Sequence, residues 1–281
     1  MDLRISVNPY TKEGDNILGF ANVVFDEQFV LENVRIRSGR IRPFVELPKY
    51  QVPARNSNGD ILKDDEGKAI YNYKDVFHPS KSTVNKEFVD AVLTEYARVT
   101  SAEYQQERRA MGNNAPRERG GIYQLDGRFE IGRIYASDYN DVKYQNGEIP
   151  IPTVGIATVH FGDSFALEKA RIKIGQYGPF VDLPKFRTAE RDENGNTVIG
   201  EDGKPKLAYK DCFHAITKEA QAALSEAIIE AYNRAPVKQS KEQEQQANIS
   251  NAPAASSTHD TFDDFDPLLI SPDFGQGQGR N

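Results

Sequence analysis

The chain contains a long internal repeat: residues 19–98 align with residues 155–234 at a constant offset of 136 and without a gap. Phe-Val-Glu-Leu-Pro-Lys at 44–49 returns as Phe-Val-Asp-Leu-Pro-Lys at 180–185, and Lys-Asp-x-Phe-His at 74–78 returns at 210–214. Solenoid repeats are much shorter, about 20–50 residues, and each unit here is long enough to bury a small core. The repeat therefore predicts two similar folded modules. Residues 136 positions apart are called twins below.

The composition along the chain predicts four segments. Module one covers residues 1–100, a flexible, mildly basic linker 101–127, module two 128–236 and a tail 237–281. A helix could continue through Glu103–Arg109, but Gly-Asn-Asn-Ala-Pro at 112–116 must end it. We expect module two to open with a strand at 129–135.

Within each module, strand patterns come first and a helix last. In module one the strands are expected at 22–25, 29–37 and 43–47, with a bulge or two covered faces in 29–37 because its alternation fails. Turn signals at 58–60 and 65–68 predict a protruding hairpin arm. The closing helix carries apolar residues at a spacing of four and begins at a cap formed by Ser82 or Thr83, or by Thr217 in module two. The predicted fold class is α+β: a small antiparallel sheet, an arm and one C-terminal packing helix per module.

Composition favours a cytoplasmic protein with no membrane partner. No apolar run approaches the ~20 residues of a membrane span, and the first residues, Met-Asp-Leu-Arg-Ile-Ser, are charged where a secretory signal is apolar. The single cysteine, Cys212, is the twin of Val76, which favours a small core residue over a redox or catalytic one.

The tail differs in kind from the modules. Its Gln-, Ser-, Ala- and Pro-rich part, 238–258, is expected to be disordered. The segment 262–270 that follows is both acidic and hydrophobic, and is a candidate binding motif for a protein partner through Phe262, Phe265, Leu268, Leu269 and Ile270. The alternative is a solubilising tail without a partner.

Net charge bounds the possible partners. The chain has 35 basic and 42 acidic residues, a formal charge of −7. Three basic and seven acidic residues follow residue 236, so the modules are nearly neutral. A nucleic-acid interface must then be a local basic patch rather than a global field.

Basic and aromatic residues gather at two places in each module. Alternating arginines at the end of the 29–37 strand can offer guanidinium forks to phosphates, and a cation beside an aromatic ring after each Leu-Pro suits single-stranded nucleic acid. A solvated face with ordinary pairing to Glu32, Glu46 or Asp182 explains the same pattern. The candidate nucleic-acid residues are Arg35, Arg37, Arg40, Arg42, Lys49, Tyr50, Arg171, Lys173, Lys185, Phe186 and Arg187.

Catalytic, metal and cofactor chemistry finds little basis in the sequence. His78 and His214 are twins that precede a helix, where an imidazole can cap or bridge backbone groups. Neither has a second histidine, cysteine pair or acidic cluster at ligand spacing. Asp75 and Asp211 are expected to accept hydrogen bonds or to pair with Lys74 and Lys210. We expect no enzyme activity, metal or cofactor.

The order of motifs resembles the SpoVG (stage V sporulation protein G, septation regulator) family. The matching stretches in module one are Phe29–Arg35, Phe-Val-x-Leu-Pro at 44–48, Lys-Asp-x-Phe-His-Pro at 74–79 and Ala-Val-Leu-Thr-Glu-Tyr at 91–96. Module two has Ala215 in place of the proline. After Met-Pro the family usually has Ser-Lys-Arg-Thr, of which only Arg187 and Thr188 are present position for position.

The resemblance implies a small α+β domain that dimerises, binds nucleic acid and regulates septation, sporulation or virulence genes in bacteria. Two fused copies could then form the pair within one chain, or associate with other chains through the module sheets. The expected function is non-enzymatic nucleic-acid binding to DNA or RNA in regulation. The alternative is a protein-interaction adaptor that uses the module surfaces and the tail, and a combination in which the tail covers the basic patch is also open.

Overall fold

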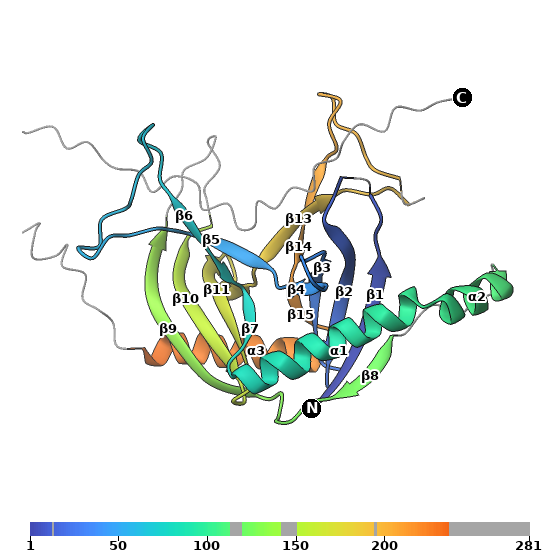
Figure 1. The fold of residues 1–281 in the computed structure, drawn as a ribbon. Helices are drawn as coiled ribbons and strands as arrows, with labels where there is room; N and C mark the ends of the chain where they lie inside the picture. The colour runs from blue at the N-terminus through green and yellow to red at the C-terminus, as the bar shows by residue number, and fades with distance from the viewer. Residues whose placement is uncertain (13, 113–119, 142–150, 194–195, 236–281) are drawn as a thin grey trace, which may run out of the picture.

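The computed structural model describes all residues except 13, 113–119, 142–150, 194–195 and 236–281 (Figure 1). The tail motif therefore lies outside the described residues. The elements of module one are β1 Asp2–Pro9, β2 Ile17–Phe25, β3 Phe29–Arg37, β4 Phe44–Glu46, β5 Lys49–Pro53, β6 Tyr71–Asp75, β7 Phe77–Pro79 and α1 Ser82–Thr100. Then come α2 Ala102–Met111 and β8 Gly121–Gln124. The elements of module two are β9 Ile131–Asp141, β10 Thr153–Phe161, β11 Phe165–Gly175, β12 Gly178–Asp182, β13 Lys185–Ala189, β14 Leu207–Asp211, β15 Phe213–Ala215 and α3 Lys218–Arg234.

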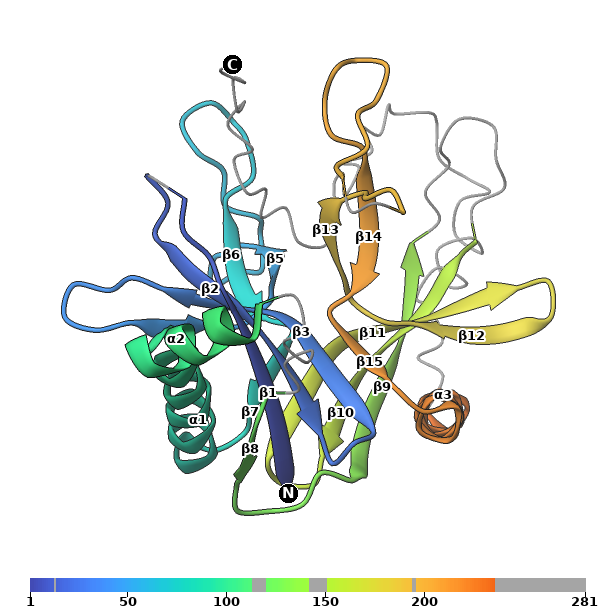
Figure 2. The ribbon, with the colours of Figure 1, turned by 90° about the vertical axis from the view of Figure 1, so that its right-hand side faces the viewer.

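Both modules have the predicted α+β architecture. Each has an antiparallel sheet, a two-stranded arm (β5–β6 or β13–β14) that rises away from it, and a helix after the arm (Figures 1 and 2). β2 and β10 alternate strictly between buried and half-buried residues, as a sheet covered mainly on one face requires. The predicted bulge is confirmed, because the pairing register of β2 with β3 shifts between Ala21 and Val23. Within the described residues, no helix is both long and apolar enough to cross a bilayer.

The two sheets exchange a short strand. After its arm, module one places β7 not on its own sheet but on β11 of module two, with Phe77 opposite Leu167. Module two returns the exchange by placing β15 on β3, with Phe213 opposite Leu31. All the paired residues are twins of one another, so the same contact is made twice in opposite directions. Isologous contacts of this kind are typical of twofold dimers.

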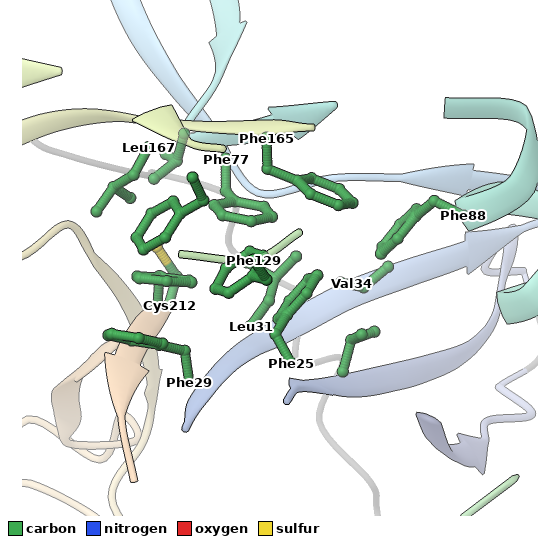
Figure 3. Packing of buried hydrophobic residues seen from close by; sticks show 14 of the residues in the cluster. Phe25, Phe29, Leu31, Val34, Phe77, Phe88, Phe129, Phe165, Leu167 and Cys212 are labelled. Carbon is green, nitrogen blue, oxygen red and sulfur yellow. The ribbon is translucent and has the colours of Figure 1, made fainter. Parts of the chain in front are cut away.

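A cluster of phenylalanine rings fills the space between the exchanged strands (Figure 3). The twin rings of Phe77 and Phe213 stack on each other with centroids 4.9 Å apart. Phe129 lies between another pair of twins, 4.4 Å from Phe25 and 4.5 Å from Phe161, and stacks on both. Aromatic burial of this extent contributes more than any other side-chain type to a core. The modules therefore share one hydrophobic core rather than having two.

Phe129 departs from its expected place in a strand. The first strand of module two begins only at Ile131, and Phe129 precedes it with a 5% exposed side chain in the shared core. The gap-free repeat does not reach this residue, but the pairings place Ile131 opposite Phe161 as they place Leu3 opposite Phe25, so Phe129 stands where module one has Met1. One ring is thus shared by both modules at the centre of the core.

The segment expected to be a linker contributes structure to module one. Ser101 ends α1 with extended backbone, and its side chain accepts a hydrogen bond from the Tyr104 amide to begin α2. β8 then pairs with β1 as an additional strand of the sheet. The carboxylate of Glu95, which is fully buried, accepts hydrogen bonds from the Tyr123 hydroxyl (2.9 Å) and from Arg98 (2.7 Å). A local reading missed this segment because its partner strand lies over 100 residues away in sequence.

The helix caps agree with prediction in one module only. Thr217 caps α3 as expected, its hydroxyl accepting from the Ala220 amide at 3.1 Å. The prediction of Ser82 or Thr83 as the cap of α1 was wrong: the cap position is Lys81, without a side-chain hydrogen bond, and α1 begins at Ser82. The first turns of α1 are instead stabilised by the packing of Val84 and Phe88 into the core.

The exchanged strand also carries an ion pair between modules. His78 of β7 places Nε2 3.5 Å from Glu168 Oε1 of β11, and its Nδ1 is 3.3 Å from the Pro79 carbonyl. The hydrogen bond to Glu168, more than the opposing effect of burial, raises the pKa of His78. The bond to His78, aided by one from the Thr158 hydroxyl, lowers the pKa of Glu168.

We predict that Phe129→Ala lowers the free energy of unfolding by about 3–5 kcal/mol, the range for removing a buried phenylalanine. Because the core is shared, one cooperative transition should remain, displaced to lower urea concentration. Urea denaturation followed by circular dichroism measures both quantities. Phe44→Ala, at a 45% exposed site, is the matched control and should change stability by less than about 0.5 kcal/mol. Two separate transitions in the parent protein would contradict a shared core.

We predict that the His78–Glu168 pair makes stability depend on pH. A raised folded pKa means that protonated His78 stabilises the fold below about pH 6.5, its ordinary unfolded pKa, and that this contribution is lost as pH rises through the folded pKa. The lowered pKa of Glu168 means that its contribution is present above about pH 4.5 and lost as pH falls through the folded value. The His78 side chain is 36% exposed, so solvent screening limits the effect to about 0.2–1 kcal/mol.

Urea unfolding of the parent and of His78→Gln from pH 5 to pH 9 tests this expectation. The stability advantage of the parent should shrink as pH rises above about 6.5, because glutamine keeps a neutral donor but cannot gain a proton. Glu168→Gln serves as the control and should remove the same pH dependence. A difference in unfolding free energy between the parent and His78→Gln that stays constant from pH 5 to pH 9 would contradict a raised pKa of His78.

Candidate nucleic-acid interface

Each arm leaves its own module and meets the sheet of the other. The ring of Tyr50, at the base of the first arm, lies 5.6 Å from the Nζ atom of Lys169 in module two. Phe186, the twin of Tyr50, meets Asn33 and Arg35 of module one. We call these places junction one (Tyr50, Lys74, Lys169 and Arg171) and junction two (Asn33, Arg35, Lys49, Phe186 and Arg187).

The bulges of β3 and β11 set the geometry of both junctions. Asn33 and Lys169 are twins, and both adopt left-handed backbone with φ of 61° and 62°. They lie beside the register shifts that the two strands make against β2 and β10. A bulge redirects the side chains around it, and here it turns residues 33 and 169 toward the aromatic ring of the opposite arm.

Junction one gathers positive charge from both modules. Burial lowers the pKa of the Lys169 ammonium, and repulsion from Arg171 and Lys74 lowers it further, against the attraction of Glu168. Burial, together with the nearby Glu168 carboxylate, raises the pKa of Tyr50 to about 12. Lys74 and Arg171 therefore each lie within electrostatic range of Lys169, beside a ring that remains neutral at ordinary pH.

Junction two forms a hollow between the modules. Its lining combines residues that are far apart in sequence: Asn33, Arg35, Leu47, Pro48, Lys49, Phe186 and Arg187. Arg187 also donates from Nε to the hydroxyl of Tyr209, the residue opposite it on the arm, at 3.0 Å. The fold thus brings together four of the candidate residues from the two modules, Arg35, Lys49, Phe186 and Arg187.

Several candidate cations bind carboxylates of their own module. The Glu46 carboxylate lies 2.8 Å from Arg37 and 3.3 Å from Lys49. Its twin Asp182 lies 2.6 Å from Lys173 and also contacts Lys185. Burial would raise the pKa of Asp182, but these two lysines outweigh it and lower the pKa. This arrangement is the ordinary intramolecular pairing that the sequence left open, although the half-buried cations can still face a ligand.

The β3–β4 turn presents the remaining candidates to solvent. Arg40 and Arg42 are exposed and have no ion-pair partner among the described residues. Between them, Ile41 is 98% exposed, and its twin Tyr177 on the β11–β12 turn is 96% exposed. These turns therefore offer an apolar side chain with flanking arginines in module one, and an aromatic side chain in module two.

Sequence reasoning missed three cations and two rings of the arms. Lys74, Lys210 and Lys169 were not named as candidates, and neither were Tyr73 and Tyr209, which are 55% and 51% exposed. The twin Tyr-Lys-Asp stretches at 73–75 and 209–211 were a usable signal, since an exposed tyrosine next to a lysine occurs in both copies. Lys169 carried no such signal because its twin is Asn33.

The acidic twins next to these lysines take other partners than expected. Asp75 is opposite Lys49 in the arm, and Lys49 lowers its pKa, although burial prevails and raises it. Asp211 lies 3.6 Å from Lys185. The expected pairs with Lys74 and Lys210 are therefore wrong, because adjacent residues of a strand point to opposite faces.

Other titratable groups have structural roles here. His78 binds Glu168 across the module boundary, and Cys212 is fully buried with its thiol donating to the Pro184 carbonyl at 3.1 Å. Burial strongly raises the pKa of the Cys212 thiol, as in a core residue. No set of three His, Cys, Asp or Glu side chains suited to a metal occurs within the described ranges.

Comparison with known proteins identifies the repeat. The SpoVG family model matches residues 1–98 and 140–234, which is more than half of the chain. A relative from Borreliella afzelii, named "Putative septation protein SpoVG", is 24% identical over 106 residues, covering 38% of this chain and 93% of the relative. Relatives of the same name from Brevibacillus brevis (31% identical, 30% of this chain, 70% of the relative) and Bacillus cytotoxicus (30%, 30% and 69%) match over 83 residues. The relatives are thus about one module long, and this chain belongs to the SpoVG family with two copies of its domain in tandem.

Proposed function

We propose that this protein is a non-enzymatic, nucleic-acid-binding regulator in which the two fused modules act as an intramolecular dimer. The observation that carries the proposal is junction one, where Lys169 of module two lies 5.6 Å from the Tyr50 ring of module one, and Lys74, opposite Tyr50 in the arm, and Arg171 both repel it. Neighbouring like charges raise the local positive potential, which attracts a ligand of opposite charge. A polyanion is the ligand that such a cluster fits best.

The arms extend this surface with aromatic rings. Tyr73 and Tyr209 are half-exposed, and each is oriented by a hydrogen bond to its hydroxyl, from Gln51 at 3.0 Å and from Arg187 at 3.0 Å. Unpaired bases stack on rings of this kind, while lysines and arginines contact the phosphates. We therefore propose single-stranded DNA or RNA as the preferred ligand. The small net charge of the modules limits binding to these local patches.

The reciprocal strand exchange supports the dimer part of the proposal. β7 and β15 close each other's sheets through twin contacts, which is how two identical chains would pair. The one-module relatives are named as septation proteins, and this name is the basis for linking the chain to septation. We propose that this chain acts in the same process, as a cytoplasmic regulator.

A second candidate function is a protein-interaction adaptor, favoured by the exposed turns. Ile41 and Tyr177 are almost fully exposed at twin positions, and apolar residues in such places are common anchors of protein interfaces. If the protein fails to bind nucleic acid, these turns are the surface to test next with alanine variants in a partner capture experiment.

We predict that Lys74→Ala combined with Lys169→Asn weakens binding to single-stranded nucleic acid. Asparagine is the residue that the twin position already accepts with the same backbone angle, so the change should leave the bulge intact. Fluorescence anisotropy with labelled single-stranded RNA, single-stranded DNA and duplex DNA, each titrated across salt, measures the effect. Losing two phosphate contacts should reduce the slope of log affinity against log salt by about 1.4 on single strands.

The matched control is Lys86→Ala combined with Lys218→Ala. It removes the same charge from exposed helix positions away from the junctions and should leave the slope unchanged. An equal loss of affinity in both variants would mean that only net charge matters, and no binding of the parent at low salt would refute the nucleic-acid proposal.

A further inference from the structure

The sheets of the two modules differ at one edge. In module one, β8 pairs with β1, from Gly121 opposite Ile5 to Gln124 opposite Asp2. In module two, β9 is the last strand of its sheet, and among the described residues it pairs only with β10 (Figure 1). Its outer row of backbone N–H and C=O groups is therefore open to another strand. Folded domains usually cover or interrupt an edge of this length.

The core-facing side chains of β9 are less buried than their counterparts in β1. The strand pairings make Ile131 the counterpart of Leu3, and Ile134 the counterpart of Ile5. Leu3 and Ile5 are 0% exposed, whereas Ile131 and Ile134 are only half-buried. In module one, Tyr123 of β8 lies opposite Leu3 and packs against the core. Module two thus leaves apolar surface exposed where module one adds a strand.

The chain leaves α3 close to this open edge. The Tyr232 hydroxyl donates to the Val154 carbonyl at 3.1 Å. Burial raises the pKa of Tyr232, and the Asp138 carboxylate of β9 adds to this, so the last turn of α3 lies beside β9. A random coil of the length of residues 236–261 spans roughly 30 Å, which is about the length of β9 itself. The segment 262–270 is therefore within reach of this edge.

One stretch of that segment has the character of an edge strand. Leu268–Ile270 is apolar and follows Pro267, which lacks an N–H group and is tolerated at the first residue of an edge strand. In an extended chain Leu268 and Ile270 point to one face and Leu269 to the other. The outer face of β8 already carries an apolar side chain, Ile122, which is 68% exposed. Leu269 on the outer face therefore has a precedent in module one.

The residue that anchors β8 has changed chemically in module two. In module one, the buried Glu95 carboxylate accepts from the Tyr123 hydroxyl at 2.9 Å and from the Gly121 amide at 3.1 Å. The twin of Glu95 is Ala231, which is half-buried and has no polar side-chain atom. A polar strand fits the edge of module one, and an apolar strand fits the edge of module two.

We propose that Leu268–Ile270 of the tail adds to the outer edge of β9 as a short antiparallel strand. The tail completes module two as β8 completes module one, and Leu268 and Ile270 cover the half-buried Ile131 and Ile134. In strand addition, main-chain hydrogen bonds provide affinity and alternate side chains provide specificity. A segment of another protein that adds a strand here must first displace the tail, so the tail controls access to this edge.

A spin label attached at Ser271→Cys tests the contact in the full chain. Cys212 is fully buried, and burial raises the pKa of its thiol, so the new cysteine is labelled selectively. In the nuclear magnetic resonance spectrum of ¹⁵N-labelled protein, the label should broaden the amide signals of residues 131–134. The signals of α2, which lies on the far side of module one, should stay unchanged (Figures 1 and 2).

Two results of the spin-label experiment would overturn the proposal. The first is an absence of broadening at residues 131–134, whether or not other surfaces such as the junctions are broadened. The second is broadening that appears when ¹⁵N-labelled protein without a spin label is mixed with spin-labelled protein without ¹⁵N. That result would mean that the edge is occupied by the tail of a second copy.

Leu268→Asp combined with Ile270→Asp is the critical variant, because both side chains face β9 in the proposed strand. Hydrogen exchange of the full chain, measured by mass spectrometry, should become about tenfold faster at the amides of residues 131–134, since two apolar side chains no longer hold the strand in place. Thr261→Asp combined with Leu269→Asp is the matched control. It adds the same charge away from the β9 face and should change the exchange rate less than about twofold. An unchanged rate in the critical variant, or equal acceleration in both variants, would refute the docked strand.

Discussion

The stacking of Phe77 on Phe213 across the two modules is the contact on which the remaining structure depends. Each ring sits on a three-residue strand that follows an arm and pairs with the sheet of the other module. A strand this short gains little from its own hydrogen bonds, and a two-stranded arm is marginal by itself. Burial of the rings supplies the missing stability. The same burial keeps β7 paired with β11 and β15 paired with β3. The base of each arm therefore lies against the opposite module, where the basic junctions form.

Fusion into one chain changes what the two copies can do. Identical chains would make two identical junctions, whereas here one twin position is Lys169 and the other Asn33. The same holds at the core and at the sheet edge: Phe129 occupies a central place once, and β8 covers only β1, where Glu95 binds Tyr123. The twin of Glu95 is Ala231, which cannot make that contact. Tandem duplication therefore allows the two halves to diverge into unequal sites while the exchanged strands stay alike.

Local patterns predicted the elements well, and long-range contacts set the limits. The hairpin strands, the arm, the bulge and the cap at Thr217 all follow from periodicity and turn residues within about ten positions. The exchange of β7 and β15, the strand β8 and the place of Phe129 depend on partners in the other module or far along the chain, and no local signal encodes them. The candidate site divides in the same way. Arg35, Lys49, Phe186 and Arg187 were recognisable as residue types, but their meeting in one hollow was not.

The buried Arg35 shows why residue type alone is a weak guide to a site. An alternating Arg35 and Arg37 in a strand suggests two equal phosphate ligands, yet the structure gives them different environments. Arg37 binds Glu46 at 2.8 Å, while Arg35 is nine-tenths buried, lies 4.0 Å from the same carboxylate, and has no hydrogen-bond acceptor for its Nε among the described residues. The difference arises because Glu46 lies opposite Arg35 in the β3–β4 ladder but bonds Arg37 and Lys49 instead. Two arginines with the same spacing in the sequence thus share one carboxylate unequally, a direct contact for Arg37 and a long ion pair for Arg35, and only the fold decides which is which.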